Sequence, residues 1–239
     1  MNISYSGKVV LVAGGTGGLG REVSLAFLRE GAKVVVTYRR EQEFTALKTA
    51  ASTNAAALEG NSIDITDGPA VAALVAGVLS RHGRLDALVN TVGGYTGGTK
   101  LWDLEPKVLE TMLSLNLRSG FTLARAVLPA MLKQRQGSIV NVAAKAAFDH
   151  GAGAAAYAAS KAAAVALMDS LAADTKGTGV RVNSILPSII DTQPNRQAMP
   201  DADFRTWPKP KDIANVILFL SSDLATTIHG ASIPVYGNS

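Results

Sequence analysis

The sequence predicts a single α/β domain built on a doubly wound parallel sheet with helices on both faces. Short apolar, β-branched runs alternate with segments of helical periodicity along the chain, which is typical of βαβ units. The 239 residues are 47% hydrophobic and 18% charged, which provides ample material for one large buried core. No internal repeat or linker-like stretch divides the chain, so residues 1–239 are expected to form one domain.

In the N-terminal half, strands and helices alternate from the start. Lys8–Ala13 is a β-branched run that ends in glycines, so we expect a buried strand. Gly18–Glu30 follows with apolar residues at helical spacing, and Gly31 would end that helix. Asp67 is a good N-cap for a helix over Asp67–Arg81. The other predicted elements are strands over Lys33–Tyr38, Ala55–Leu58 and Leu85–Asn90, and a helix over Glu41–Ala51.

The C-terminal half continues this alternation but contains long segments that need separate explanation. Thr91–Leu101 contains four glycines and is expected to be a loop. Glu105–Gln134 is long for one ordinary helix, so two abutting helices are predicted. Pro187–Pro210 carries five prolines without periodicity, and such excursions are usually functional, so a substrate-side loop is expected there. The remaining predicted elements are strands over Ser138–Ala143, Val180–Leu186 and Ser232–Tyr236, and helices over Gly153–Ala173 and Lys211–Ser222.

Composition excludes several classes of function. Lys and Arg number 23 against 19 Asp and Glu, a mild net charge of +4 without a dense basic run, so nucleic acid is not an expected partner. The absence of cysteine and the scattered positions of three histidines give no metal-ligand pattern. The sequence shows neither a signal-peptide pattern nor an uncharged apolar run long enough to span a membrane. We therefore expect a cytoplasmic protein that acts on a small-molecule substrate.

A glycine-rich loop between the first strand and the first helix is the first functional signal. Gly14–Gly20 contains overlapping G-x-G-x-x-G and G-x-x-x-G-x-G spacings. Glycines let the backbone approach a diphosphate, and the following helix N-terminus offers free N–H groups and a positive dipole end. In this strand–loop–helix context the pattern predicts dinucleotide binding. The expected contacts are Gly14, Thr16, Gly17, Gly18, Leu19 and Gly20.

The end of the second strand indicates which dinucleotide is bound. An acidic residue there would hold the ribose hydroxyls of NAD, but this chain has Tyr38, Arg39 and Arg40. No carboxylate would repel a 2′-phosphate, and a guanidinium can bind it with paired hydrogen bonds. We therefore expect NADP(H) in preference to NAD(H). The alternative is that both arginines are solvated residues at the start of a helix.

A second functional signal is the pair Tyr157 and Lys161 on the Ala-rich helix. Their spacing of four places both side chains on one helix face. A phenol with a pKa of about 10 is a poor acid–base catalyst at neutral pH, but a nearby ammonium lowers that pKa. Tyr157 is therefore predicted to be the proton donor and Lys161 to lower its pKa. The alternative is a surface lysine beside a half-buried tyrosine.

Together with the glycine loop, this pair makes the chain resemble the short-chain dehydrogenase/reductase family over essentially its whole length. The resemblance implies a Rossmann-type fold and an oxidoreductase in which Lys161 also binds the nicotinamide ribose and Asn116 anchors a proton-relay water. It implies homodimers or homotetramers formed through the Glu105–Gln134 segment and the Tyr157 helix. Further coenzyme contacts implied by it are Asp64, Ile65, Asn90, Val92, Gly93, Pro187, Ile189 and Thr192.

The chain departs from the family pattern in ways that affect its chemistry. Ala13, Thr91–Val92 and Ser188 stand where the family usually has Thr, Asn-Ala and Gly. Ala144 stands 13 residues before Tyr157, where the family has a serine that donates a hydrogen bond to the substrate oxygen. Losing such a donor costs about 3 kcal/mol when an oxyanion forms. Either the protein binds NADP without turnover, or its substrate develops little alkoxide character.

A narrower resemblance favours the second explanation. Gly93–Gly98, Ala144–Ala147 and much of Leu186–Trp207 are similar to quinoid dihydropteridine reductases, which also lack the serine. We therefore expect hydride transfer to a planar conjugated acceptor such as a quinonoid dihydropterin. Tyr95 could stack on a flat substrate or cap its own loop, so Tyr95, Ala144 and Tyr157 are the candidate substrate contacts. The alternatives are reduction of a ketone or 3-oxoacyl group, and a catalytically silent NADP-binding or sensing module.

Overall fold

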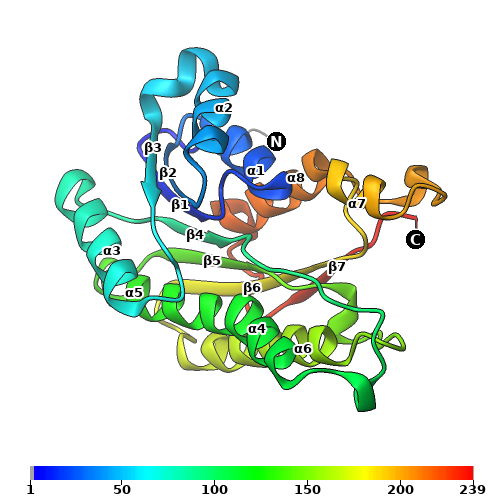
Figure 1. Cartoon of the computed structure of the whole chain (residues 1–239). Coiled ribbons are helices and arrows are strands. Elements are labelled where there is room, and N and C mark those ends of the chain that lie inside the picture. The colour runs from blue at the N-terminus through cyan, green and yellow to red at the C-terminus, as the bar shows by residue number, and fades with distance from the viewer. Residues whose placement is uncertain (1–2, 239) are drawn as a thin grey trace.

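Seven parallel strands form one sheet in the order β3-β2-β1-β4-β5-β6-β7 (Figure 1). The computed structural model describes residues 3–238, so Met1, Asn2 and Ser239 of the predicted domain lie outside the described residues. The strands are β1 (Val9–Ala13), β2 (Lys33–Tyr38), β3 (Leu58–Ser62), β4 (Ala87–Asn90), β5 (Gly137–Val142), β6 (Val180–Pro187) and β7 (Ser232–Val235). Parallel neighbours require crossover connections, and here these place helices on both faces of the sheet. The predicted doubly wound α/β fold is confirmed.

The helices form two layers. One face of the sheet is covered by α1 (Gly18–Arg29), α2 (Glu41–Ala51) and α8 (Pro210–Ser221) (Figure 1). The other face is covered by α3 (Gly68–His82), α4 (Pro106–Leu113), α5 (Ser119–Gln134) and α6 (Ala155–Asp174). The short α7 (Gln193–Ala198) lies in the proline-containing excursion. None of the described helices is long and apolar enough to cross a membrane.

Alternate residues of each strand face opposite helix layers. Val10 and Val12 of β1 belong to the same core cluster as Phe27 of α1. Leu11, between them, belongs to a second cluster that contains Leu123 of α5. Both sides of β1 are therefore buried, which explains why this strand reads as an unbroken apolar run instead of an alternating one.

The third strand lies later in the chain than predicted. We expected a strand over Ala55–Leu58, but Ser52–Ala57 forms a 3-10 helix and the strand runs over Leu58–Ser62. The observed strand, LEGNS, is largely polar because it is the edge of the sheet, paired only with β2 among the described strands. A Cβ at Gly60 would lie 2.4 Å from the Phe44 ring, so glycine here lets α2 pack closely. The prediction failed because backbone pairing and this close approach, not apolar side chains, define the strand.

The predicted pair of helices over Glu105–Gln134 is joined by a π-helical turn. α4 leads directly into the turn at Ser114–Arg118, and α5 begins at Ser119. π-helical turns are rare in proteins, and those that occur are often found at functional sites. This turn carries Asn116, whose side chain is buried.

Candidate active site

The predicted site residues meet at the carboxyl ends of four neighbouring strands. β1 leads into the Gly14–Gly20 loop, and β4 ends at Asn90. β5 ends shortly before Ala144, and β6 ends at Pro187. The chain leaves β1 and β4 toward opposite faces of the sheet, and ligands of open α/β sheets bind at such a switch point. The fold therefore brings the glycine loop, the Tyr157 helix and the excursion to one edge.

The glycine loop is shaped by contacts that admit no side chain. Gly14 has φ +71°, and a Cβ on Gly20 would lie 2.0 Å from the Gly14 carbonyl oxygen. The Gly17 N–H donates to that same oxygen at 3.1 Å, which closes the turn before α1. No side chain caps the N-terminus of α1 and its first turn has no acidic residue, so its N–H groups are available to a phosphate.

The start of the excursion lies against this loop. A Cβ on Gly18 would lie 3.0 Å from Cγ2 of Thr192, so the chain after β6 passes beside the N-terminus of α1. Thr192 therefore lies beside the glycine loop, and Pro187 ends β6 at the same edge of the sheet. Ile189 is 42% exposed between them, although it is a large apolar residue. An apolar side chain exposed at this edge is suited to cover a flat ring.

A cavity of about 230 Å³ lies at the ends of β2 and β3. Tyr38, Arg39 and Asp64 line it, together with Ser62 and Ile63. The Arg39 guanidinium lies 3.9 Å from the Asp64 carboxylate, and both side chains are largely exposed. Hydrogen bonds from the Thr66 backbone and hydroxyl hold the pKa of Asp64 below its usual value, with a smaller effect of Arg39. Arg39 thus faces the cavity with its charge only weakly compensated.

The neighbouring residues are engaged with α2. Arg40 donates a hydrogen bond to Glu43, and the Tyr38 hydroxyl donates to Glu41. Thr16 of the glycine loop also donates to Glu43, at 3.1 Å. Of the two predicted arginines, Arg39 is therefore the one that lines the cavity.

Three predicted coenzyme contacts are internal. Leu19 and Ile65 are buried in the two core clusters, so only their backbones could reach a ligand. Asn90 donates to Asn141 at 2.9 Å and accepts from the Val92 N–H at 3.2 Å. These side chains shape the edge of the sheet. Val92 itself packs against Gly14, whose Cβ would lie 2.8 Å from its Cγ2.

The Asn116 amide connects three parts of the site. Its oxygen accepts from the Gly94 N–H at 2.9 Å, and its nitrogen donates to the Gly94 carbonyl at 3.1 Å and to the Ser160 hydroxyl at 2.9 Å. Both amide N–H donors are thus used within the protein. Asn116 is a positioning residue that ties the Gly93–Gly98 loop to α6, and its role toward a relay water stays a prediction.

Lys161 is buried beside the same loop. Its ammonium donates to the Val142 carbonyl at 3.0 Å, and a Cβ on Gly93 would lie 3.0 Å from its Nζ. Burial lowers the pKa of Lys161 to about 8. The alternative of a surface lysine is wrong, because only 5% of this residue is exposed.

The predicted depression of the Tyr157 pKa by Lys161 is not observed. Burial, with a smaller contribution from Tyr95, raises the pKa of Tyr157 to about 12. Lys161 directs its ammonium at the Val142 carbonyl, and its own charge is disfavoured by burial. Tyr157 is therefore a neutral hydroxyl near pH 7, which is the form that donates a proton.

Ser160 and Ser138 are the serines nearest to Ala144 in sequence, and neither supplies the hydrogen-bond donor that is missing at that position. Ala144 is buried at the end of β5. The Ser160 hydroxyl donates to the Tyr157 carbonyl at 2.7 Å and accepts from Asn116. Ser138 lies at the start of β5 and donates to the Leu220 carbonyl, at the opposite edge of the sheet.

Tyr95 lies edge-on to Tyr157, with ring centroids 4.9 Å apart at 81°. Its ring is 67% exposed, and its hydroxyl fills the space where Gly97 has no side chain. The Gly98 N–H donates to the Gly153 carbonyl at 2.9 Å, which joins this loop to the start of α6. An exposed aromatic residue thus packs against the ring of the candidate proton donor.

Comparison with known proteins identifies the family to which this chain belongs. The family profile described as short chain dehydrogenase matches residues 8–203. The chain belongs to the short-chain dehydrogenase family. It is accordingly an oxidoreductase of a family that uses NAD(H) or NADP(H).

Individual relatives of this short-chain dehydrogenase span nearly all of it. It is 31% identical over 240 residues to the 3-oxoacyl-[acyl-carrier-protein] reductase FabG of Thermotoga maritima, covering 97% of each chain. It is 31% identical over 251 residues to 2-(S)-hydroxypropyl-CoM dehydrogenase 3 of Xanthobacter autotrophicus, covering 99% of this chain and 98% of the other. A solved short-chain type dehydrogenase/reductase from Mycobacterium ulcerans superposes with a TM-score of 0.93 at 26% identity, covering 98% and 90%. These relatives support the family but not the narrower resemblance to dihydropteridine reductases.

Sequence reasoning missed two residues that hold this short-chain dehydrogenase site together. The Thr91 hydroxyl donates to the Ala13 and Gly14 carbonyls, at 2.7 and 3.2 Å, and thereby fixes β4 to the glycine loop. The Thr37 hydroxyl accepts from the Gly14 N–H at 3.0 Å. The sequence signal that could have identified them was a threonine at or just after the end of a predicted strand.

Among residues 3–238, no group of three or more metal-ligating side chains is arranged to hold an ion.

The burial of Lys161 predicts how stability depends on pH. The ammonium is disfavoured in the folded state, so its penalty is fully present below pH 8 and is relieved as pH rises toward the ordinary pKa of 10.5. Relative to a Lys161→Met variant, the wild-type free energy of unfolding should rise by about 2 kcal/mol between pH 7 and pH 10. Urea unfolding of both proteins across this range measures the difference. Parallel pH profiles would contradict the buried ammonium.

Proposed function

We propose that the protein is an NADPH-dependent reductase that delivers hydride to the carbonyl carbon of a ketone or 3-oxoacyl substrate. The observation that carries this proposal is Tyr157, a neutral hydroxyl one helical turn from a buried lysine at the coenzyme edge of the sheet. Reduction of a carbonyl consumes a proton, and the neutral phenol is the form that can supply it. The name of one relative refers to a 3-oxoacyl group and that of the other to a hydroxypropyl group, which agrees with carbonyl–alcohol chemistry.

The glycine loop and the cavity at β2 and β3 fit a dinucleotide. The loop backbone and the N-terminus of α1 would hold the diphosphate, because no side chain caps the N–H groups of that helix end. Glycine at position 20 lets the loop turn tightly enough to present these groups, since a Cβ there would collide with the Gly14 carbonyl oxygen. Arg39 and Asp64 would border the adenosine end, with Arg39 toward a 2′-phosphate. When bound, NADPH supplies the hydride.

The protein residues then bind, orient and supply the proton. Lys161, which lies beside Gly93, would donate to hydroxyl groups of the nicotinamide ribose. Asn116 fixes the Gly94 backbone relative to α6, which keeps the loop and Tyr157 in register. Tyr157 donates its proton to the substrate oxygen, and Tyr95 packs edge-on against the Tyr157 ring and helps to orient it.

A quinonoid dihydropterin or another planar conjugated acceptor is the second candidate substrate. It is favoured by Ala144, which removes a donor that would stabilise a localised oxyanion, and by the exposed ring of Tyr95. Charge that spreads over a conjugated imine needs less stabilisation from such a donor.

We also propose a cytoplasmic location and a homodimer or homotetramer formed through α4, α5 and α6, where Leu109 and Phe121 are exposed apolar residues.

The decisive experiment follows NADPH absorbance with an acetoacetyl thioester and, separately, with quinonoid dihydrobiopterin. We expect turnover of at least one substrate and a loss of about a hundredfold or more in kcat in the Tyr157→Phe variant, because the proton donor is removed. Greater turnover of the thioester supports the carbonyl substrate, and greater turnover of the pterin supports the second candidate. Tight NADPH binding without turnover of either substrate would establish a silent binding module.

The missing serine gives a second prediction. Ala144→Ser should raise kcat/KM for a ketone by at least about tenfold, because it restores a hydrogen-bond donor to the developing oxyanion, and should change pterin reduction little. Ala159→Ser, the same change at an exposed position of α6, is the matched control. A large gain on both substrates would contradict this account of Ala144.

The arginine at the end of β2 gives a third prediction. Arg39→Ala should lower the preference for NADPH over NADH by about tenfold or more, because Arg39 lines the cavity and can pair with the 2′-phosphate. Arg40→Ala should have a smaller effect, because Arg40 is engaged with Glu43. Lys48→Ala, which removes a positive charge from an exposed position of α2, controls for net charge. KM values for both coenzymes measure the effect, and an unchanged ratio in Arg39→Ala would reject the assignment.

A further inference from the structure

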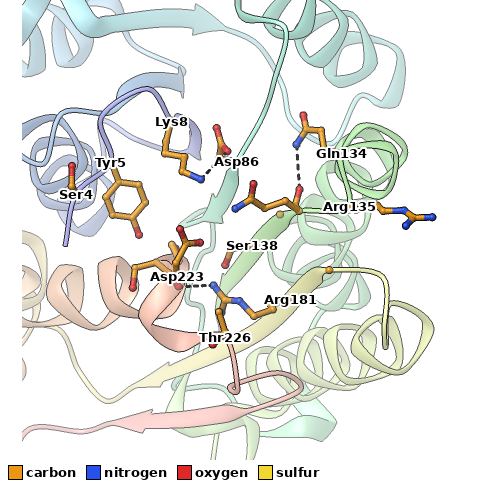
Figure 2. A pocket seen from close by; sticks show the side chains of 15 residues that line it. Ser4, Tyr5, Lys8, Asp86, Gln134, Arg135, Ser138, Arg181, Asp223 and Thr226 are labelled. Carbon is orange, nitrogen blue, oxygen red and sulfur yellow. Dashed lines mark hydrogen bonds and ion pairs between the residues drawn. The ribbon is translucent and has the colours of Figure 1, made fainter. Parts of the chain in front are cut away.

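A larger cavity lies at the opposite edge of the sheet, at the amino ends of the strands. Its volume is about 440 Å³, within the range of small-molecule sites, which begins at about 300 Å³. Lys8 precedes β1, Asp86 precedes β4, and Ser138 and Arg181 lie at the start of β5 and β6; all four line it (Figure 2). The cavity is thus separated from the candidate active site by the length of the sheet.

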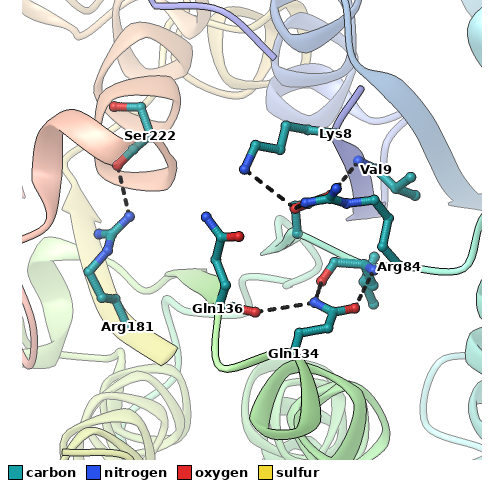
Figure 3. Close-up of polar contacts among 9 residues, drawn as sticks. Lys8, Val9, Arg84, Gln134, Gln136, Arg181 and Ser222 are labelled. Carbon is teal, nitrogen blue, oxygen red and sulfur yellow. Dashed lines mark hydrogen bonds and ion pairs between the residues drawn. The ribbon is translucent and has the colours of Figure 1, made fainter. Parts of the chain in front are cut away.

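One of its two acidic residues, Asp86, is already neutralised by neighbouring cations. Asp86 accepts hydrogen bonds from the Val9 N–H and from Arg84 Nε, both at 2.8 Å (Figure 3). Arg84 also contacts the second carboxylate oxygen, and the Lys8 ammonium lies 3.7 Å from it. Two cations therefore share one carboxylate, which leaves a surplus positive charge at this wall.

The facing wall carries a cation bound only by neutral groups. Arg181 donates to the Leu220 carbonyl at 2.6 Å and to the Ser222 carbonyl at 2.9 Å, at the end of α8. No carboxylate of the described residues lies within 4.0 Å of its guanidinium, and its Nε–H has no hydrogen-bond partner among them. Burial lowers the pKa of Arg181, partly offset by Tyr5 and Asp223, which reflects the cost of holding this charge away from water.

A further donor lies between these two walls. The Gln136 side chain extends into the cavity between Lys8 and Arg181 (Figure 3). Its amide has no hydrogen-bond partner among the described residues, unlike that of Gln134, which is bound to the Leu85 backbone. The cavity therefore combines two cationic groups and an amide N–H donor, the set that binds carboxylate or phosphate oxygens.

We propose that this cavity is a second ligand site, which binds a small anion through a carboxylate or phosphate group held between Lys8 and Arg181. Its lining has three cationic residues, Lys8, Arg135 and Arg181, against the acidic Asp86 and Asp223. The site needs neither the coenzyme nor the reaction at the other edge of the sheet, so it is independent of the proposed function.

Isothermal titration of the full chain with inorganic phosphate, and separately with succinate, tests the site at constant ionic strength. We expect at least one anion to bind, and the one that binds more tightly identifies the preferred group. Lys8→Gln and Gln136→Trp should each weaken binding at least fivefold, the first by removing a cation and the second by filling the cavity. Lys48→Gln, with the same change of charge on α2, should leave binding unchanged.

The variants are chosen so that a folding defect does not obscure the result. Asp86 keeps Arg84 when Lys8 is replaced, and the Gln136 side chain makes no hydrogen bond that Gln136→Trp would break. Circular dichroism checks the fold of each variant, and if one unfolds the other decides. Absence of heat with both anions would overturn the proposal. Binding that is equal in wild type and both variants would also overturn it, because the anion would then lie elsewhere, for example at the glycine loop.

Discussion

Burial of both faces of a parallel sheet is the constraint on which the rest of this structure depends. Strands such as β1 are apolar on both sides because helices cover both sides, so polar chemistry is confined to the two ends of the strands. At the carboxyl ends, the loops gather glycines, Tyr157 and Lys161. At the amino ends, the residues that begin the strands gather Lys8, Asp86 and Arg181. One architectural rule thus accounts for the positions of both sites.

Burial is the main influence on the pKa values of Tyr157 and Lys161 in the candidate active site. Lys161 and Tyr157 are both held toward their neutral forms, in contrast to a pair in which an ammonium stabilises a phenolate. A neutral tyrosine is suited to giving a proton in the reductive direction. In the proposed reaction, with Ala144 in place of a second donor, this hydroxyl would be the main hydrogen-bond donor to the substrate oxygen. A substrate that develops less negative charge on its oxygen is therefore favoured.

The sequence predicted the parts of this structure that depend on local pattern. β1, the glycine loop and the Tyr157–Lys161 spacing each follow from a few consecutive residues, and the structure places them at one edge. It placed β3 too early in the chain, because the pairing of this strand with β2 depends on backbone contacts and on the approach of Phe44 to Gly60. It also gave the wrong direction for the Tyr157 pKa, because depth of burial and the orientation of the Lys161 ammonium depend on the whole fold.

The π-helical turn at Asn116 limits how this protein can vary. A π turn holds one more residue than an α-helical turn, so losing a single residue from Ser114–Arg118 would convert this stretch into an ordinary α-helical turn and change the position of Asn116 on the helix. Asn116 could then no longer reach both Gly94 and Ser160, which lie on different segments. The length of this stretch is therefore fixed by geometry, and descendants of this gene should tolerate changes of residue type there more readily than insertions or deletions.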